Sequence, residues 1–153
     1  MENQYLHEVA ITGIIIKDGK YLLIRRSPDK KRFPSMWVVP GGKLEGKDYL
    51  VFPKDTKNFW YRVLERTLER EVLEEVGLKI KNVRYLTSIT TIHKDGVPSL
   101  IISFIADYDS GEVSLNTAES SEFAWVNLDE AKNYDLIDGI YDELVMAENK
   151  TNQ

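Results

Sequence analysis

The sequence predicts an α/β protein in which a mixed β-sheet carries helices on its faces. Two observations lead to this class. Runs rich in β-branched residues recur along most of the chain, and a long helical pattern in the middle and an amphipathic one near the C-terminus accompany them. A sheet of this kind buries its faces under helices. The chain has 153 residues, 42% of them hydrophobic, so we expect a single domain over residues 1–153.

The first expected strands form a hairpin. Residues 9–16 and 21–26 are rich in β-branched and aliphatic side chains, and the Asp-Gly pair between them favours a tight hairpin turn. Residues 36–40 then read as a short strand that ends at Pro40 and leads directly into two glycines.

The remaining strands lie in the second half of the chain. Residues 82–93 and 99–108 read as two strands joined by a turn, and residues 122–128 alternate between apolar and polar side chains as a half-buried strand does. Residues 111–115 fit a short edge strand.

Helical patterns occupy three places. Irregular residues 43–58 lead into a helix that we expect from residue 59 or 60 to residue 76, because apolar side chains recur there with the helical period. Residues 128–134 begin a short helix, and residues 137–150 form an amphipathic helix near the C-terminus.

The end of the long helix is unusually acidic. Its apolar stripe runs into Glu71 and Glu75, with Glu74 beside them, and Gly77 then ends the helix. Each pair of like charges costs roughly 0.2–0.5 kcal/mol, and the helix dipole disfavours carboxylates at this end. A solvated charged face is the ordinary interpretation of a glutamate-rich helix. Carboxylates beside a buried stripe need a partner, however, and Arg70 neutralises only one of them, whereas a hard divalent cation accommodates several.

Two sequence segments together resemble the box of the Nudix hydrolase family, G-x5-E-x7-R-E-U-x-E-E-x-G-U, where U is aliphatic. Residues 70–78 match its second half completely, and Gly42 matches the start of its first half. Asp48 stands where the family usually has glutamate. Residues 49–69 make the spacer 14 residues longer than the seven of the family.

The resemblance implies a Nudix-like α/β/α sandwich and a hydrolase that depends on Mg²⁺ or Mn²⁺. Its substrates would be nucleoside diphosphates linked to another group. Glu74 and Glu75 would be metal ligands together with the backbone carbonyl of Gly41. Glu71 would be a further ligand or the base that activates water, and Arg70 would orient it. The ions would relieve the repulsion among the carboxylates and activate water.

Further candidates lie outside the helix. By resemblance, Glu119 is an additional metal ligand or the base, and Glu122 is the competing choice. Arg25 and Arg26 alternate across a strand, so one of them can face a cleft and clamp a phosphate; we take Arg25 as the candidate. His93 reads as a surface histidine, with phosphate contact as the alternative.

The first half of the box and the insertion supply the remaining candidates. We place Gly42 and Asp48 among the substrate-binding residues. The insertion is rich in aromatic residues, and Phe52 is a candidate for stacking on a nucleobase. Residues 49–62 would then form a substrate lid, while a dimer contact and packing in the core are the alternatives.

Composition excludes several classes of function. The chain has no cysteine, which excludes disulfides and thiolate chemistry, and its net charge of −5 argues against binding of long nucleic acid. The apolar runs are too short to span a membrane, and no secretory signal is visible, so we expect a cytoplasmic protein.

These observations favour a small-molecule nucleotide as substrate, acted on by a monomer or homodimer. Nucleoside triphosphates and nucleotide sugars compete, so an ADP-ribose or ADP-sugar pyrophosphatase is an alternative. A nucleotide sensor without catalysis is the alternative from another class.

Overall fold

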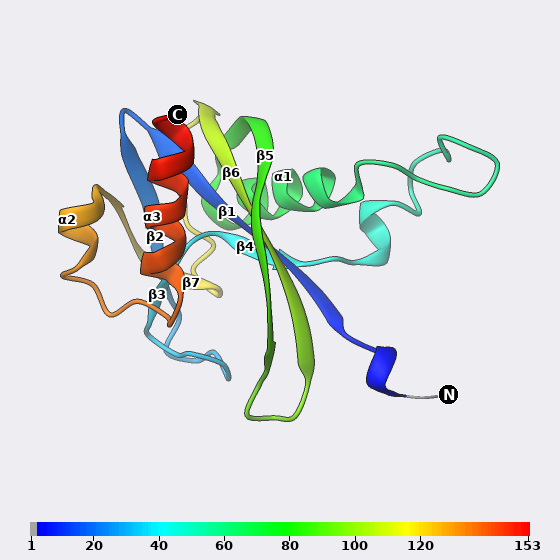
Figure 1. The fold of residues 1–153 in the computed structure, drawn as a ribbon, viewed down its shortest axis with the longest axis horizontal. Helices are drawn as coiled ribbons and strands as arrows, with labels where there is room; N and C mark the ends of the chain where they lie inside the picture. Colours follow the sequence, from blue (N-terminus) through cyan, green and yellow to red (C-terminus); the bar gives the residue numbers. More distant parts are fainter. Residues whose placement is uncertain (1–2) are drawn as a thin grey trace.

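The computed structural model describes residues 3–153. Its strands are β1 (Glu8–Lys17), β2 (Lys20–Arg26), β3 (Trp37–Val38), β4 (Gly41–Lys43), β5 (Lys79–Ile92), β6 (Pro98–Ser110) and β7 (Ser120–Val126). Within the described residues they form one seven-stranded sheet with the order β3-β2-β1-β6-β5, to which β4 adds beside β1 and β7 beside β2 (Figure 1). β1 and β6 run parallel, and neighbours such as β1 and β2 or β5 and β6 run antiparallel, so the sheet is mixed as expected.

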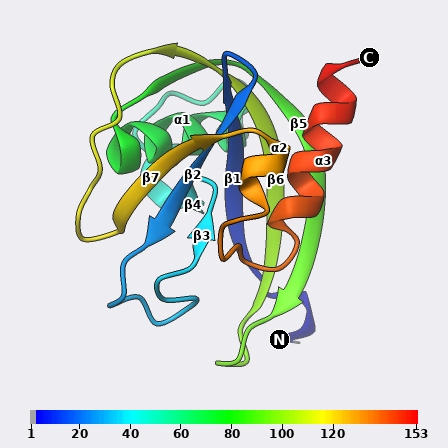
Figure 2. The same cartoon turned by 90° about the vertical axis from the view of Figure 1, so that its left-hand side faces the viewer.

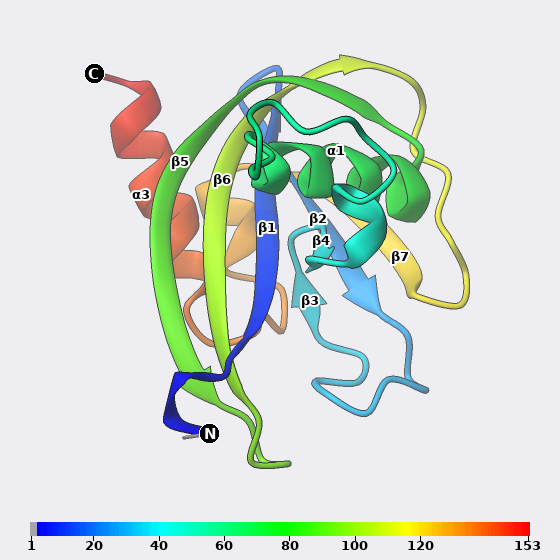
Figure 3. The ribbon, with the colours of Figure 1, turned by 90° about the vertical axis from the view of Figure 1, so that its right-hand side faces the viewer.

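Helices cover both faces of this sheet. The long helix α1 (Val63–Val76) lies on one face (Figure 3), and α3 (Ile140–Thr151) lies on the other beside the short α2 (Leu128–Ala131) (Figure 2). Alternation along β1 divides the core between them. Ile11 and Ile15 pack in the same cluster as Leu68 of α1, whereas Ile14 packs with Leu144 of α3. The structure thus confirms an α/β/α sandwich.

Short 3-10 helices complete the described elements at η1 (Asn3–Tyr5) and η2 (Gly46–Asp48). The second lies directly after β4, in the segment that we expected to be irregular. In the described part of the chain, no helix combines the length and the apolar character that crossing a bilayer requires.

The prediction of an edge strand at residues 111–115 is wrong. The backbone N–H groups of Ser114 and Asn116 donate instead to the carbonyl oxygens of Val76 and Glu75, at 2.9 Å each. These carbonyls belong to the last turn of α1 and have no partner within the helix. The segment therefore serves as a cap for the C-terminus of α1 and does not pair with the sheet.

The start of α1 and the role of the glycine pair also differ from expectation. The helix begins at Val63, because Arg62 before it has a left-handed backbone with φ of 60° that a right-handed helix cannot continue. We expected Gly41 and Gly42 to lie directly after a strand that ends at Pro40, but they belong to a strand themselves. They form β4 and pair with Thr12 and Ile11 of β1, which brings this backbone alongside α1.

Candidate functional site

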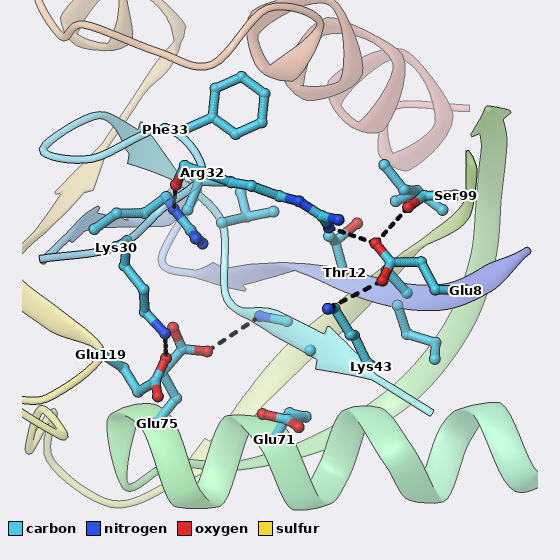
Figure 4. Close-up of a pocket in the computed structure, with 18 of the residues that line it drawn as sticks. Glu8, Thr12, Lys30, Arg32, Phe33, Lys43, Glu71, Glu75, Ser99 and Glu119 are labelled. Atoms are coloured by element: carbon cyan, nitrogen blue, oxygen red, sulfur yellow. Dashed lines mark hydrogen bonds and ion pairs between the residues drawn. The ribbon is translucent and has the colours of Figure 1, made fainter. Parts of the chain in front are cut away.

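An open cleft of about 710 Å³ lies between the C-terminal half of α1, β4 and the loop that joins β2 to β3 (Figure 4). Its lining has acidic and basic parts. The acidic side chains from α1 and from the loop before β7 are Glu71, Glu74, Glu75 and Glu119. The cationic side chains from β2, the β2–β3 loop and β4 are Arg26, Lys30, Lys31, Arg32 and Lys43. The cleft therefore offers ligands for a cation beside partners for an anion.

Glu75 is held by hydrogen bonds from two sides. Its Oε2 accepts from the backbone N–H of Gly41 at 3.3 Å, and its Oε1 accepts from Ser120 Oγ at 3.3 Å. Burial, with the nearby charges of Glu71 and Glu119, raises the pKa of Glu75 to about 7. Burial also raises the pKa of Glu71. Both side chains thus occupy positions that disfavour their charge unless a cation is near.

Close contacts with neighbouring residues leave no room for a side chain at Gly41 or Gly42 of β4. A Cβ atom at Gly41 would lie 2.3 Å from the carbonyl oxygen of Ile11, which is inside contact distance of the backbone of β1. At Gly42 a Cβ would lie 2.1–2.5 Å from the carboxylate atoms of Glu71. The absence of a side chain at Gly42 therefore gives the carboxylate of Glu71 room to pack directly against the backbone of β4.

Arg70 forms hydrogen bonds with two of the carboxylates of the acidic helix and holds them in position. Its Nη1 donates to Glu71 Oε1 at 2.8 Å and to Glu74 Oε2 at 3.1 Å, and its Nη2 donates to Asp48 Oδ2 at 3.1 Å. The hydrogen bond to Asp48 is the main reason that the pKa of Arg70 is raised, so the guanidinium stays charged. The side chain of Asp48 is 1% exposed and does not line the cleft. In the structure Asp48 is a buried partner for Arg70.

Of the two arginines at the end of β2, Arg26 lines the cleft and Arg25 does not. Arg25 donates to Glu122 Oε2 at 3.0 Å and to the carbonyl of Ser35 at 2.9 Å, outside the cleft. Arg26 donates through Nε to the carbonyl of Arg32 at 2.9 Å, and burial lowers its pKa. The structure therefore brings Arg26 to the cleft, and not the candidate Arg25.

Glu119 joins the acidic end of the cleft from the loop before β7. It pairs with Lys30 of the β2–β3 loop, and both side chains point toward Glu75 (Figure 4). The competing candidate Glu122 lies outside the cleft with Arg25. Of the two candidate carboxylates, Glu119 is thus the one that the fold brings to the helix.

The inserted residues 49–62 project beyond the start of α1, at the opposite end of this helix from Glu75 (Figures 1 and 3). The ring of Phe52 lies 4.7 Å from the guanidinium of Arg66, and Trp60 Nε1 donates to the carbonyl of Phe52 at 2.9 Å. All of these inserted residues are described, and none of them lines the cleft. Phe52 is therefore placed where it contacts α1, away from the acidic cluster.

The donor set fits a hard divalent cation, although protein groups now occupy the carboxylates. Among residues 3–153, no three acidic or histidine side chains are grouped closely enough to coordinate an ion in their present orientations. Glu71 and Glu74 bond to Arg70, and Glu119 bonds to Lys30. Their oxygens are the ligand type that Mg²⁺ and Mn²⁺ prefer. The cleft beside these carboxylates has room for such an ion, which would replace some of these internal partners.

Comparison with known proteins shows which proteins the chain resembles. A family model described as NUDIX domain matches residues 6–145. The NAD-capped RNA hydrolase NudC of Chromobacterium violaceum is 32% identical over 116 residues, which make up 76% of this chain and 37% of that protein. The chain spans between 24% and 37% of the length of the curated relatives that it matches.

Solved structures share the fold at low sequence identity. A MutT NUDIX hydrolase from Burkholderia pseudomallei is 23% identical, with a TM-score of 0.71 over 92% of this chain and 98% of that chain. The NUDIX domain of NrtR from Shewanella oneidensis, solved in a complex with ADP ribose, is 18% identical, with a TM-score of 0.71 over 95% of this chain and 89% of that chain. At these identities the likeness shows the α/β/α fold alone.

Proposed function

Since the chain belongs to the Nudix family, with a NUDIX domain over residues 6–145, we propose that it is a pyrophosphohydrolase that depends on Mg²⁺ or Mn²⁺. It hydrolyses the diphosphate bond of a nucleoside diphosphate linked to another group. The observation that carries this proposal is the meeting of four carboxylates with the cationic side chains of Arg26 and Lys30 in one cleft. A diphosphate needs both parts, because cations must neutralise its oxygens before water can attack phosphorus.

Glu74, Glu75 and the carbonyl of Gly41 are the proposed ligands for the ion, with Glu71 and Glu119 completing the set. A bound divalent ion would lower the pKa of water and neutralise phosphate charge. One of these two residues, Glu71 or Glu119, would instead act as the base and accept the proton of the attacking water, because both lie in the cleft beside the other proposed ligands.

The remaining residues of the cleft position these groups. Arg70 bonds to both Glu71 and Glu74 and so fixes the spacing of two carboxylates on adjacent helical turns. Asp48 in turn holds Arg70. Arg26 would bind a phosphate oxygen, because its Nε is anchored on the backbone of the β2–β3 loop and its guanidinium lines the cleft.

The size of the cleft supports a small-molecule nucleotide as substrate. A volume of about 710 Å³ lies within the range of pockets that hold small ligands and cofactors. Nucleoside triphosphates and nucleotide sugars remain the two substrate groups, and ADP-ribose is the preferred member of the second because a NUDIX domain of the same fold was solved with it.

A substrate screen tests the proposal. The purified protein with Mg²⁺ or Mn²⁺ is given nucleoside triphosphates, ADP-ribose and other nucleotide sugars, NAD and dinucleoside polyphosphates, and the release of phosphate, pyrophosphate or nucleoside monophosphate is measured. Glu75→Gln serves as the inactive control. We expect hydrolysis of at least one group that requires the metal and is lost in the control. Hydrolysis that survives both EDTA and the Glu75→Gln change would reject the proposal.

The same assay assigns the base. Glu71→Gln and Glu119→Gln are compared at saturating metal and across pH. The variant that loses kcat while its Mn²⁺ affinity stays near that of the wild type carries the base, and the variant that loses Mn²⁺ affinity carries a ligand.

A further inference from the structure

A second polar network lies at the other end of the cleft from the acidic cluster (Figure 4). Glu8 accepts hydrogen bonds from Lys43 Nζ at 3.0 Å, from Ser99 Oγ at 2.6 Å and from Arg32. Arg32 also donates through Nη2 to Asp95 Oδ2 at 2.9 Å. Arg32 thereby ties the β2–β3 loop to the start of β1 and to the turn between β5 and β6. The proposed chemistry makes no use of this distal network.

The charges of the distal network balance one another. Burial raises the pKa of Glu8, but hydrogen bonds from Ser99, Arg32 and Lys43 outweigh it and lower this pKa to about 2. Two cationic and two anionic side chains then face each other at neutral pH. A phosphate group would find no excess of positive charge here, whereas a neutral ring with polar edges would find fixed donors and acceptors.

The side chain of Phe33 lies above this network, and packing in the core does not explain its position. Its side chain lines the cleft and the residue is 42% exposed, so it contributes little to the core. Its φ of 50° lies in the left-handed region, which is costly for a bulky residue. The ring of Phe33 packs edge to face against the imidazole of His93, with a centroid distance of 6.3 Å and an interplanar angle of 68°. This contact helps to hold Phe33 in place. Strained residues that persist at a cleft are commonly kept for function.

The spacing along β1 relates the two ends of the cleft. Thr12 of β1 pairs with Gly41, at the acidic end, and Glu8 lies four residues earlier on the same strand. At about 3.3 Å per residue the two positions are roughly 13 Å apart. This is comparable to the length of an extended nucleoside 5′-phosphate. A diphosphate bound at the acidic cluster would therefore bring the attached nucleoside to Phe33 and the distal network.

We propose that Phe33 and the distal network form the subsite for the nucleobase of the substrate. Phe33 offers the base an aromatic face, and Arg32, Lys43 and their carboxylate partners bond to the polar edge of the ring. The inference rests on the proposed function for the position of the phosphates. It adds that an aromatic base, and not a sugar or a further phosphate, is recognised at this end.

Product binding tests the subsite without turnover. Isothermal titration calorimetry in Mg²⁺ compares AMP, GMP, CMP and UMP with ribose 5-phosphate, which has the same phosphate and sugar but no base. We expect at least one nucleotide to bind the wild type about tenfold or more tightly than ribose 5-phosphate. Phe33→Ala should lower the affinity for that nucleotide by about 5- to 150-fold, the range that corresponds to the loss of stacking on one base. It should leave the affinity for ribose 5-phosphate unchanged within about twofold.

Two further variants make the test specific. Phe33→Tyr keeps an aromatic face and should restore nucleotide affinity. Phe123→Ala removes a phenylalanine of similar exposure, 45%, that does not line the cleft, and should bind all probes as the wild type does.

Three results would overturn the inference. They are equal binding of nucleotides and ribose 5-phosphate by the wild type, equal weakening of both by Phe33→Ala, and no effect of Phe33→Ala on either. The outcome is separable from the proposed function. A failed hydrolysis screen with intact base-dependent binding rejects the reaction alone, and hydrolysis without base-dependent binding rejects the subsite alone.

Discussion

Glu75→Gln is expected to stabilise the metal-free protein at neutral pH and to remove most of its activity. Burial raises the pKa of Glu75 from 4.5 to about 7 in the folded state. Between these two pH values the unfolded chain releases a proton that the folded protein keeps, so the free energy of unfolding falls as the pH rises. At pH 7 the loss amounts to at most about 3 kcal/mol. Below pH 4.5 both states hold the proton, and the penalty is absent.

Glutamine carries no charge at any pH, so the free energy of unfolding of the variant should not show this fall with rising pH. For a chain of this length, about 3 kcal/mol corresponds to a Tm roughly 6–12 °C above that of the wild type at pH 7. The measurement is a series of thermal melts from pH 4 to pH 8 in EDTA. Glu74→Gln is the matched control, because the side chain of Glu74 is 49% exposed and should show no such gain.

Activity provides the second half of the same test. In Mg²⁺, Glu75→Gln should lose at least about a hundredfold in kcat, comparable to the loss of other essential electrostatic groups. If the Tm of the variant and the Tm of the wild type change with pH in the same way in EDTA, the argument from burial is refuted. Near-normal turnover would refute the assignment of Glu75 as a metal ligand.

Three other expectations concern the groups around the cleft. Asp48→Ala should lower the free energy of unfolding, measured in urea, by about 3–5 kcal/mol because it leaves Arg70 without its buried partner; a loss below about 1 kcal/mol would contradict this pairing. Millimolar Mn²⁺ or Mg²⁺ should raise the Tm of the wild type and raise it less in Glu74→Gln, and an unresponsive wild type would count against a site formed before substrate binds. Phe52→Ala should leave KM and kcat within about twofold, since Phe52 does not line the cleft; a KM raised more than about fivefold would show that the insertion acts as a substrate lid.

The acidic half of the site follows from the sequence alone. Glu71, Glu74 and Glu75 lie within two turns of one helix, so the helical repeat determines how they face one another. The end of that helix is equally local, because Gly77 adopts the left-handed conformation with φ of 73° that the sequence pattern predicts. The same local reasoning explains why most strands were predictable, since alternation and turn residues act over a few positions.

The identity of the other groups in the cleft required the tertiary structure. Simple alternation along β2 cannot select Arg26 over Arg25, because a bulge between these two residues shifts the pairing of β2 with β7. Aromatic content drew attention to the insertion around Phe52, yet the exposed aromatic residue in the cleft is Phe33, from a polar loop. Residue type was a poor guide in both cases, because position relative to α1 depends on distant contacts.

Long-range pairing explains the difference. The parallel register of β1 with β6 brings Glu8 opposite Ser99 and so creates the distal network, although 91 positions separate the two residues in the chain. Hydrophobic period and turn chemistry are properties of a single segment and can be read from its residues. Which segments pair, and in what register, depends on burying both faces of the sheet over the whole chain, and only the folded structure determines it.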